Sequence, residues 1–333
     1  MLAAIFGVAG PTLRGEERGF FRDVQPLGFI LFARNVVDPD QVRRLVNDLR
    51  ASVEHAEAPV LIDQEGGRVQ RLRPPHWRAA AAAAKFGVLA VQRADTGRRA
   101  VFLNHQLIGA DLAALGIDVD CAPLIDVHQP GAHDVIGDRA FSGDPEQVAA
   151  LGRAAADGLL SVGITPVIKH IPGHGRTMVD SHHHLPRVTA SRAELSRTDF
   201  VPFKRLADLP WAMTAHILYE AIDPAQPATL SAKVISEIIR GEIGFDGLLL
   251  SDDLSMKALR GTLGELAQRS VAAGCDIALH CNGKMEEMVE VAAGVPPLSK
   301  VGLERYTRGR RQVGKGQLVK LDQVAKELTA LLA

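Results

Sequence analysis

The side chains that could bind or transform a substrate are concentrated directly after the apolar runs of this sequence. The apolar run Ile164–Ile168 is followed by Lys169 and then by five of the twelve histidines, all within Lys169–His184. Imidazoles titrate near neutral pH, so this segment could donate and accept protons in a reaction. The same segment holds Asp180 and His182, and other charged or histidine side chains at the ends of the runs or in the loops after them are Asp63, Arg71, Asp126, Asp138, Arg139, His216, Asp252, Asp253 and His280.

A histidine cluster of this kind could hold a metal ion, but its spacing argues against one. Pro172 and Gly173 separate His170 from His174, so the two rings cannot share one helical face as paired zinc ligands do. The first apolar run of the chain also ends in Gly7-Val8-Ala9-Gly10, which offers no ligand. A metal-dependent hydrolase is therefore the second hypothesis, and no metal ligand is assigned.

Two further chemistries fit the same residues. Lys169 at the end of an apolar run could form a Schiff base, although no clear phosphate-binding glycine loop accompanies it. Retaining glycoside hydrolysis instead needs a carboxylate nucleophile and a second group that protonates the leaving oxygen. Asp252 fits the first role because it ends an apolar run, and Asp180-Ser181-His182 fits the second because the carboxylate can orient the imidazole. Such acid–base help is typically worth about 10² to 10⁴ in rate.

Eight short apolar runs recur along the chain, and longer amphipathic segments separate them. Because the runs are continuous rather than alternating, they are typical of parallel strands buried on both faces. Strand then helix, repeated eight times, predicts an α/β fold, a single (β/α)8 TIM barrel over residues 1–333, with catalytic groups at the carboxyl ends of its strands. The predicted strands are Ala3–Val8, Gly28–Phe32, Pro59–Ile62, Ile117–Leu124, Ile164–Ile168, Ala212–Ile217, Gly247–Leu250 and Asp276–Leu279.

Helix-start signals precede several of the amphipathic segments. Asp38 and Asp144 each stand before a proline, as N-caps commonly do, and Ser191 with Glu194 forms a capping-box pattern. The alanine run Ala79–Ala84 is also expected to be part of a helix, because alanine has the highest helix propensity. The predicted helices are Gln41–Glu54, Glu146–Ser161, Arg192–Leu206, Lys233–Glu242 and Leu263–Ala273.

The composition excludes several classes of partner. The chain carries 38 basic and 39 acidic side chains, a net charge of −1, which lacks the basic signature of nucleic-acid or anionic-membrane binding. No apolar run approaches the roughly 20 residues of a membrane helix, and the three cysteines form no CxxC pair. Met1–Ala9 has no basic residues before it, so it predicts a strand rather than a signal peptide. We expect a cytoplasmic monomer that binds a small molecule, no nucleic acid and no membrane.

Four motifs, in the right order along most of the chain, resemble those of glycoside hydrolase family 3. They are DQEGGRVQR at Asp63–Arg71, VIGDRAF at Val135–Phe141, KHIPGHG at Lys169–Gly175 with the later Asp180-Ser181-His182, and SDDLSM at Ser251–Met256. The Asp-Ser-His triplet is similar to the one in the family's bacterial β-N-acetylglucosaminidases, which act in the recycling of the cell wall. A chain of 333 residues also leaves no room for the second α/β domain of many family-three β-glucosidases.

The resemblance implies a role for each matching residue. Asp252 would be the nucleophile that forms a covalent glycosyl-enzyme intermediate, and His182, paired with Asp180, would be the general acid/base. The substrates would be GlcNAc-1,6-anhydroMurNAc fragments and peptides released from peptidoglycan, and no metal or organic cofactor is implied. The hydroxyls and the N-acetyl group of the terminal sugar would be bound by Asp63, Arg71, Arg139, Lys169 and His170.

Some features depart from this pattern. Two further histidines follow His182, so its role rests on the Asp-Ser-His spacing, and the segment His128–His133 is unusual. A third hypothesis, a sugar-binding protein without activity, is disfavoured because a pure binder gains nothing from a nucleophile beside an acid. Aromatic residues are scarce, at 5% of the chain, and the candidates for stacking on a sugar are Trp77, Phe141 and Trp211.

Overall fold

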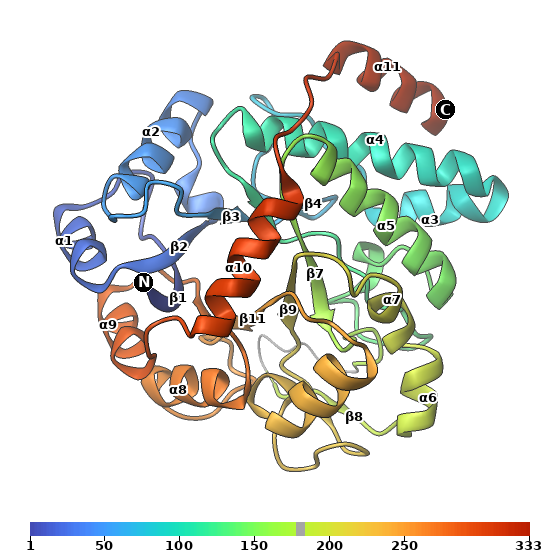
Figure 1. Cartoon of the computed structure of the whole chain (residues 1–333). Helices are drawn as coiled ribbons and strands as arrows, with labels where there is room; N and C mark the ends of the chain where they lie inside the picture. The colour runs from blue at the N-terminus through green and yellow to red at the C-terminus, as the bar shows by residue number, and fades with distance from the viewer. Residues whose placement is uncertain (178–183) are drawn as a thin grey trace.

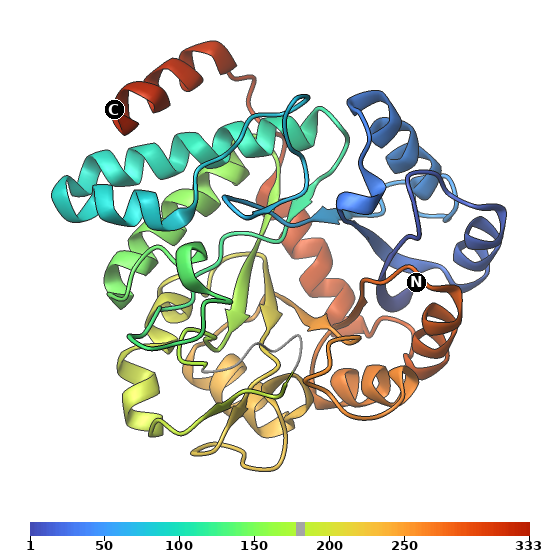
Figure 2. The same ribbon diagram turned by 180° about the vertical axis from the view of Figure 1, so that it is seen from behind.

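The protein, in a computed structural model that describes residues 1–177 and 184–333, is built around a closed barrel of eight parallel strands. Helices surround the strands on all sides, as Figures 1 and 2 show from opposite directions. The predicted (β/α)8 TIM barrel is therefore confirmed. In their order around the ring, the strands are β1 (Leu2–Gly7), β2 (Pro26–Leu31), β3 (Val60–Ile62), β6 (Val119–Asp120), β7 (Thr165–Ile171), β9 (Trp211–Thr214), β11 (Leu248–Asp253) and β12 (Ile277–His280).

The inside of the barrel is filled by apolar side chains from all eight strands. In β3, Leu61 belongs to this inner cluster, whereas Val60 and Ile62 pack in a second cluster between the barrel and its helices. Successive side chains of a strand point to opposite faces, so an uninterrupted apolar strand supplies both cores. This arrangement explains why the eight strands could be located as continuous apolar runs.

The helices around the barrel begin near the predicted caps. The Asp38 carboxylate accepts the Gln41 N–H at 2.8 Å, and the Asp144 carboxylate accepts the Glu146 N–H at 2.9 Å. The helices are α1 (Gly15–Val24), α2 (Pro39–Arg50), α3 (Ala83–Gln92), α4 (Ala94–Ala113), α5 (Pro145–Ser161), α6 (Arg192–Arg197), α7 (Phe200–Arg205), the π-helix η4 (Val234–Glu242), α8 (Leu263–Ala273), α9 (Met285–Gly294), α10 (Lys300–Val313) and α11 (Leu321–Leu332).

Helix α10 lies across the strands at the amino-terminal end of the barrel, where Figure 1 shows it in front of them. The Tyr306 ring of α10 packs against Trp211 at the start of β9, with 6.0 Å between the ring centroids. Arg305 binds Asp276 and Asp246, which precede β12 and β11, at 3.0 Å each. This end of the barrel is therefore covered, and substrates must enter from the other end.

The prediction of a helix over Ala79–Ala84 is wrong for most of the run, because α3 begins only at Ala83. The Ala80 N–H donates to the Gln70 side chain at 3.1 Å, and the Ala80 carbonyl accepts the Gly67 N–H at 2.9 Å. These long-range hydrogen bonds replace the helical ones. A Cβ on Gly66, whose φ is +100°, would lie 2.6 Å from the Ala81 carbonyl oxygen, so the run packs closely on the loop after β3.

The predicted helix Arg192–Leu206 is broken into α6 and α7. At the break, the Asp199 carboxylate accepts from Arg176 Nε at 2.7 Å, and the Thr198 hydroxyl accepts from another nitrogen of the same guanidinium at 2.9 Å. Glu194 also binds Arg176, at 2.7 Å, instead of closing a capping box. The break thus anchors the loop that follows β7.

Two strands differ in length from their predictions. Strand β6 covers only Val119–Asp120 of the predicted Ile117–Leu124, because Pro123 has no N–H for a regular ladder. Strand β7 continues beyond Ile168 to Ile171, so Lys169 and His170 lie in the strand rather than after it. Among the described helices, none is both long enough and apolar enough to cross a membrane.

Candidate active site

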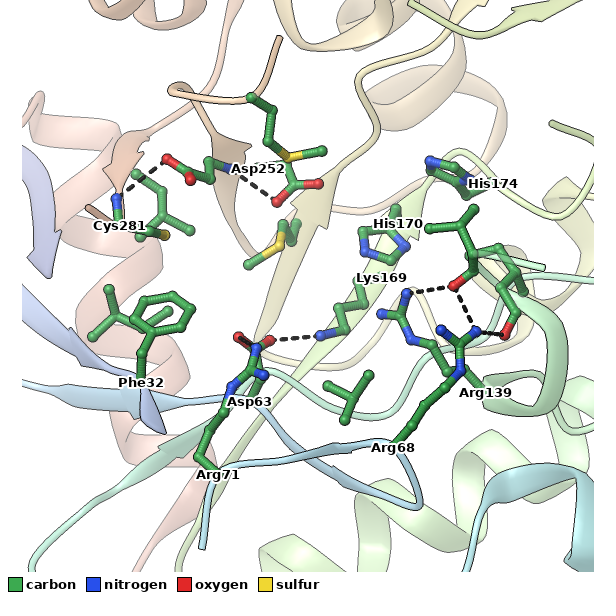
Figure 3. Close-up of a pocket in the computed structure, with 18 of the residues that line it drawn as sticks. Phe32, Asp63, Arg68, Arg71, Arg139, Lys169, His170, His174, Asp252 and Cys281 are labelled. Carbon is green, nitrogen blue, oxygen red and sulfur yellow. Dashed lines mark hydrogen bonds and ion pairs between the residues drawn. The ribbon is translucent and has the colours of Figure 1, made fainter. Parts of the chain in front are cut away.

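A pocket of about 460 Å³ opens at the carboxyl ends of the barrel strands. It is lined by Asp252 and by all five residues that were predicted to bind the sugar, which therefore come together from different strands and loops (Figure 3). Asp180 and His182, the predicted acid/base pair, lie outside the described residues. The five predicted binding residues are Asp63, Arg71, Arg139, Lys169 and His170.

A network of buried charges forms one side of the pocket. Lys169 Nζ lies 2.8 Å from Asp63 Oδ1 and 2.7 Å from Glu65 Oε1. Arg139 grips both Glu65 oxygens, at 2.9 and 2.8 Å, and Arg71 lies 3.2 Å from Asp63 Oδ2. Glu65 was not assigned a role from the sequence, although its i,i+2 spacing from Asp63 places both side chains on the same side of an extended segment.

The network fixes the protonation of its members. Burial disfavours the Lys169 ammonium, but Asp63 and Glu65 outweigh burial and raise its pKa above the ordinary value. Burial likewise opposes the Asp63 carboxylate, and the charges of Lys169 and Arg71 nevertheless lower its pKa. A lysine held protonated is not nucleophilic, so this geometry disfavours the Schiff-base hypothesis.

His170 is oriented by a buried carboxylate that the sequence placed at the end of a strand. Asp126 is completely buried, and its Oδ2 lies 2.8 Å from His170 Nδ1. Its Oδ1 accepts the backbone N–H groups of His170 and His174, at 3.1 and 2.6 Å. Burial, with the nearby charge of His170, lowers the pKa of His174 to about 4, so its imidazole is neutral at pH 7. Asp126 therefore holds the first part of the loop after β7 in place.

Asp252 and Asp253 both line the pocket, although neighbouring residues of a regular strand face opposite sides. The register between β11 and β12 shifts between Leu250 and Asp253, and this irregularity interrupts the alternation. Asp253 is engaged by the Ser255 hydroxyl at 2.6 Å and the Cys281 N–H at 3.2 Å, so it organises the loop. Asp252 Oδ1 accepts only the next backbone N–H, at 2.8 Å, and within residues 1–177 and 184–333 its Oδ2 has no hydrogen-bond partner.

The charge around Asp252 suits a nucleophile. Burial alone would raise its pKa, but His216, His170 and Lys169 together lower that pKa below the ordinary value. His216 is itself held by the Thr229 hydroxyl at 2.7 Å and the Asp253 carbonyl at 3.0 Å. His216 and His280 are both fully buried and do not line the pocket, so their role is structural rather than in contact with a bound molecule.

The Glycosyl hydrolase family 3 N terminal domain matches residues 10–302 of the chain. The chain belongs to glycoside hydrolase family 3. Four motifs of the sequence had indicated this family, and the barrel and the pocket that they line agree with it.

Relatives narrow the activity of this family-three enzyme. It is 42% identical over 285 residues to a protein of Alkalilimnicola ehrlichii named beta-hexosaminidase, covering 84% of this chain and 80% of that one. A beta-hexosaminidase of Pseudomonas aeruginosa is 39% identical over 316 residues, which are 93% of this chain and 90% of that one. The crystal structure of native NagZ from Neisseria gonorrhoeae superposes with a TM-score of 0.88, at 30% identity, over 99% of this chain and 98% of that one. The enzyme is a glycoside hydrolase, a β-N-acetylhexosaminidase.

The aromatic residues proposed for sugar stacking are not in the pocket of the family-three enzyme. Trp211 and Phe141 are buried in the apolar cores, and Trp77 packs at the edge of the cluster between the barrel and its helices. Phe32, which follows β2, lines the pocket instead, with the guanidinium carbons of Arg34 and Arg71 at 5.0 and 5.3 Å from its ring centroid. Within the described residues, no three histidine, cysteine or acidic side chains are grouped to hold a metal ion.

Asp120, at the end of β6, is a fully buried acid beneath the charge network. Its Oδ1 accepts the Gln64 N–H at 3.0 Å, and Oδ2 has no hydrogen-bond partner in the described part of the chain. Burial raises the pKa of Asp120 to about 8, against the opposing effects of the Gln64 N–H and Lys169. The folded protein therefore keeps a proton on Asp120 at neutral pH.

We expect Asp120→Asn to stabilise the protein at alkaline pH. The unfolded chain releases the Asp120 proton near pH 4 and the folded chain near pH 8, so the free energy of unfolding falls between these values, by up to about 1.4 kcal/mol per pH unit. Asparagine cannot ionise and removes this loss. The Tm of the variant relative to wild type should increase from pH 5 to pH 9, and a difference independent of pH would contradict the assignment.

Proposed function

We propose that the enzyme is a retaining β-N-acetylglucosaminidase that removes the non-reducing terminal GlcNAc from GlcNAc-1,6-anhydroMurNAc and its peptides in peptidoglycan recycling. The observation that carries the proposal is the Asp252 carboxylate, whose Oδ2 has no partner among the described residues, in a pocket with the Asp63–Lys169–Glu65 network. A pocket with this network but without the Asp252 carboxylate could bind the sugar but could not form a covalent intermediate.

The proposed reaction has two displacement steps. Asp252 Oδ2 bonds to the anomeric carbon while the glycosidic C–O bond breaks, and His182, paired with Asp180, gives its proton to the leaving oxygen. Water then attacks the same carbon, His182 takes a proton from it, and the bond to Asp252 breaks. Two inversions at one carbon return the β configuration. The lowered pKa of Asp252 supports its role, because only the carboxylate can attack.

The remaining pocket residues bind the terminal sugar in this proposal. Asp63 accepts hydroxyl protons, while Lys169 and Arg71 hold that carboxylate in place at 2.8 and 3.2 Å. Arg139 and His170 donate to further oxygens of the sugar, and both are already fixed, by Glu65 and Asp126. Donors and acceptors fixed in advance lose little freedom on binding, which compensates for the scarcity of aromatic rings. Recycling of this kind also implies a cytoplasmic enzyme, which we propose acts as a monomer.

We expect GlcNAc-1,6-anhydroMurNAc to be cleaved with GlcNAc appearing first as the β-anomer, because a retaining enzyme inverts the carbon twice. Proton NMR during the first minutes of hydrolysis distinguishes the anomers. An aryl β-glucoside is the control for sugar specificity, and addition of EDTA is the control for metal dependence. Release from the N-acetyl sugars alone, unaffected by EDTA, is the expected pattern. Initial release of the α-anomer would contradict the retaining mechanism. Loss of activity with EDTA would favour the metal-dependent hydrolase.

A further inference from the structure

The lining of the pocket is divided between buried and exposed residues. The side chains of Lys169 and Arg139 are only 2% and 11% exposed, and they close the inner end, with Glu65 behind them. His133 and Asp134 are exposed and line the same pocket, as does Arg68, whose side chain is 42% exposed. An enzyme that releases one terminal sugar must hold that sugar at the closed end, so the leaving group lies against the exposed residues.

The exposed rim segment 133–136, in the loop between β6 and α5, is held firmly. The Arg68 guanidinium donates to the carbonyls of Val135 and Ile136, at 3.0 and 3.1 Å, and pairs with Asp138 at 2.7 Å. The His133 N–H donates to the Thr177 carbonyl at 2.7 Å, which ties the segment to the loop after β7. The segment is thus bound from two sides, and a side chain on it has a defined position.

The His133 imidazole is fixed as a hydrogen-bond donor. Its Nδ1 accepts the Val135 N–H at 3.0 Å, so the ring proton is on Nε2. Among the described residues, no acceptor is hydrogen-bonded to Nε2. Arg68, the nearby cation of the rim, has its charge paired with Asp138 through Nε, and one of its terminal nitrogens donates to backbone carbonyls. The His133 imidazole is therefore an oriented N–H donor at the rim that no described residue uses.

We propose that His133 determines specificity for the leaving group, by donating from Nε2 to the lactyl carboxyl oxygen, acid or amide, of a muramyl-type sugar. This inference rests on the proposed function, because it concerns the sugar on the reducing side of the bond that the enzyme cleaves. A lactyl ether adds a carboxyl oxygen that a plain N-acetylglucosamine leaving group lacks. A donor at the rim can therefore distinguish the two classes of leaving group without touching the sugar at the closed end.

The test compares kcat/KM of wild type and His133→Leu on three substrates: GlcNAc-1,6-anhydroMurNAc, chitobiose and an aryl β-N-acetylglucosaminide. We expect about a tenfold loss on the muramyl disaccharide, which is the contribution of one hydrogen bond, and changes within about twofold on the other two. His133→Gln keeps a side-chain N–H and should recover part of the loss. His76→Leu, at an exposed histidine that does not line the pocket, is the matched control and should change none of the three.

Each other outcome overturns the inference. Equal losses on all three substrates would mean that His133 supports the pocket as a whole. A loss on chitobiose as large as on the muramyl disaccharide would place the contact on a group that both leaving sugars share. The wild-type rates test the proposed function separately: a wild type that cleaves chitobiose but not the muramyl disaccharide would contradict that function, whatever the variants do.

Discussion

Asp252→Asn is expected to lower kcat by about 10³-fold or more on aryl and natural β-N-acetylglucosaminides, while the protein remains folded. The amide oxygen is a poor nucleophile and carries no negative charge to stabilise the developing oxocarbenium ion. Asparagine has nearly the same shape and can still accept the Asp253 N–H that Asp252 accepts at 2.8 Å. The Tm and KM should therefore change little, and stopped assays with purified variant measure the loss.

Asp253→Asn is the matched control for this prediction. Asp253 lies next in β11 and also lines the pocket, but its carboxylate is bonded to Ser255 and to the Cys281 N–H. We expect a smaller loss of kcat there and a larger loss of Tm, because the hydrogen bonds of the loop are weakened. Near-normal activity of Asp252→Asn would contradict the assignment of Asp252 as the nucleophile. A greater loss of kcat in Asp253→Asn would assign that role to Asp253 instead.

Lys169→Met is expected to destabilise the protein by about 3 to 5 kcal/mol and to abolish binding of the terminal sugar. Removal of the ammonium leaves Asp63 and Glu65 as buried carboxylates, 14% and 8% exposed, without the charge that lies 2.8 and 2.7 Å away. Both carboxylates have pKa values below the ordinary range, so the stability that they contribute is present above pH 4 and is lost on acidification. Denaturant unfolding at pH 7 measures the effect.

Two further variants distinguish the cause. The double variant Lys169→Met, Asp63→Asn should recover part of the stability, because Glu65 keeps its pair with Arg139 and the other carboxylate that lost the ammonium is neutral, but it should not recover the activity. Lys284→Ala breaks a pair of similar length, 2.8 Å to Glu287, at a lysine that is largely exposed, and should shift the Tm only slightly. Equal destabilisation by Lys169→Met and Lys284→Ala would mean that burial of the network does not matter.

The position of Asp252 and of the five predicted sugar-binding residues could be anticipated because a parallel barrel brings the carboxyl ends of its strands to one edge. A polar residue directly after a buried apolar run must then lie at that edge. This argument needs only local sequence, and it located Asp63, Asp126, Lys169 and Asp252 in or beside the pocket.

Features that depend on contacts far apart in the sequence could not be predicted in this way. The alanine run Ala79–Ala84 is mostly not helical because Gln70 and Gly67 compete for its backbone groups. The break between α6 and α7 depends on Arg176, which comes from another loop. Phe32 was counted as the last residue of a strand, and only the three-dimensional structure shows that it lines the pocket.

Trapping of the glycosyl-enzyme intermediate tests the central claim most directly. A 5-fluoro N-acetylglucosaminyl fluoride slows both displacement steps through its ring fluorine, but its good leaving group keeps the first step the faster one, so the intermediate accumulates. Mass spectrometry of the protein after digestion should then find one fluorinated N-acetylhexosaminyl group on the peptide that contains Asp252. The label should be absent from Asp252→Asn. A label on another carboxylate, or none while the reagent is consumed normally, would contradict the proposed mechanism.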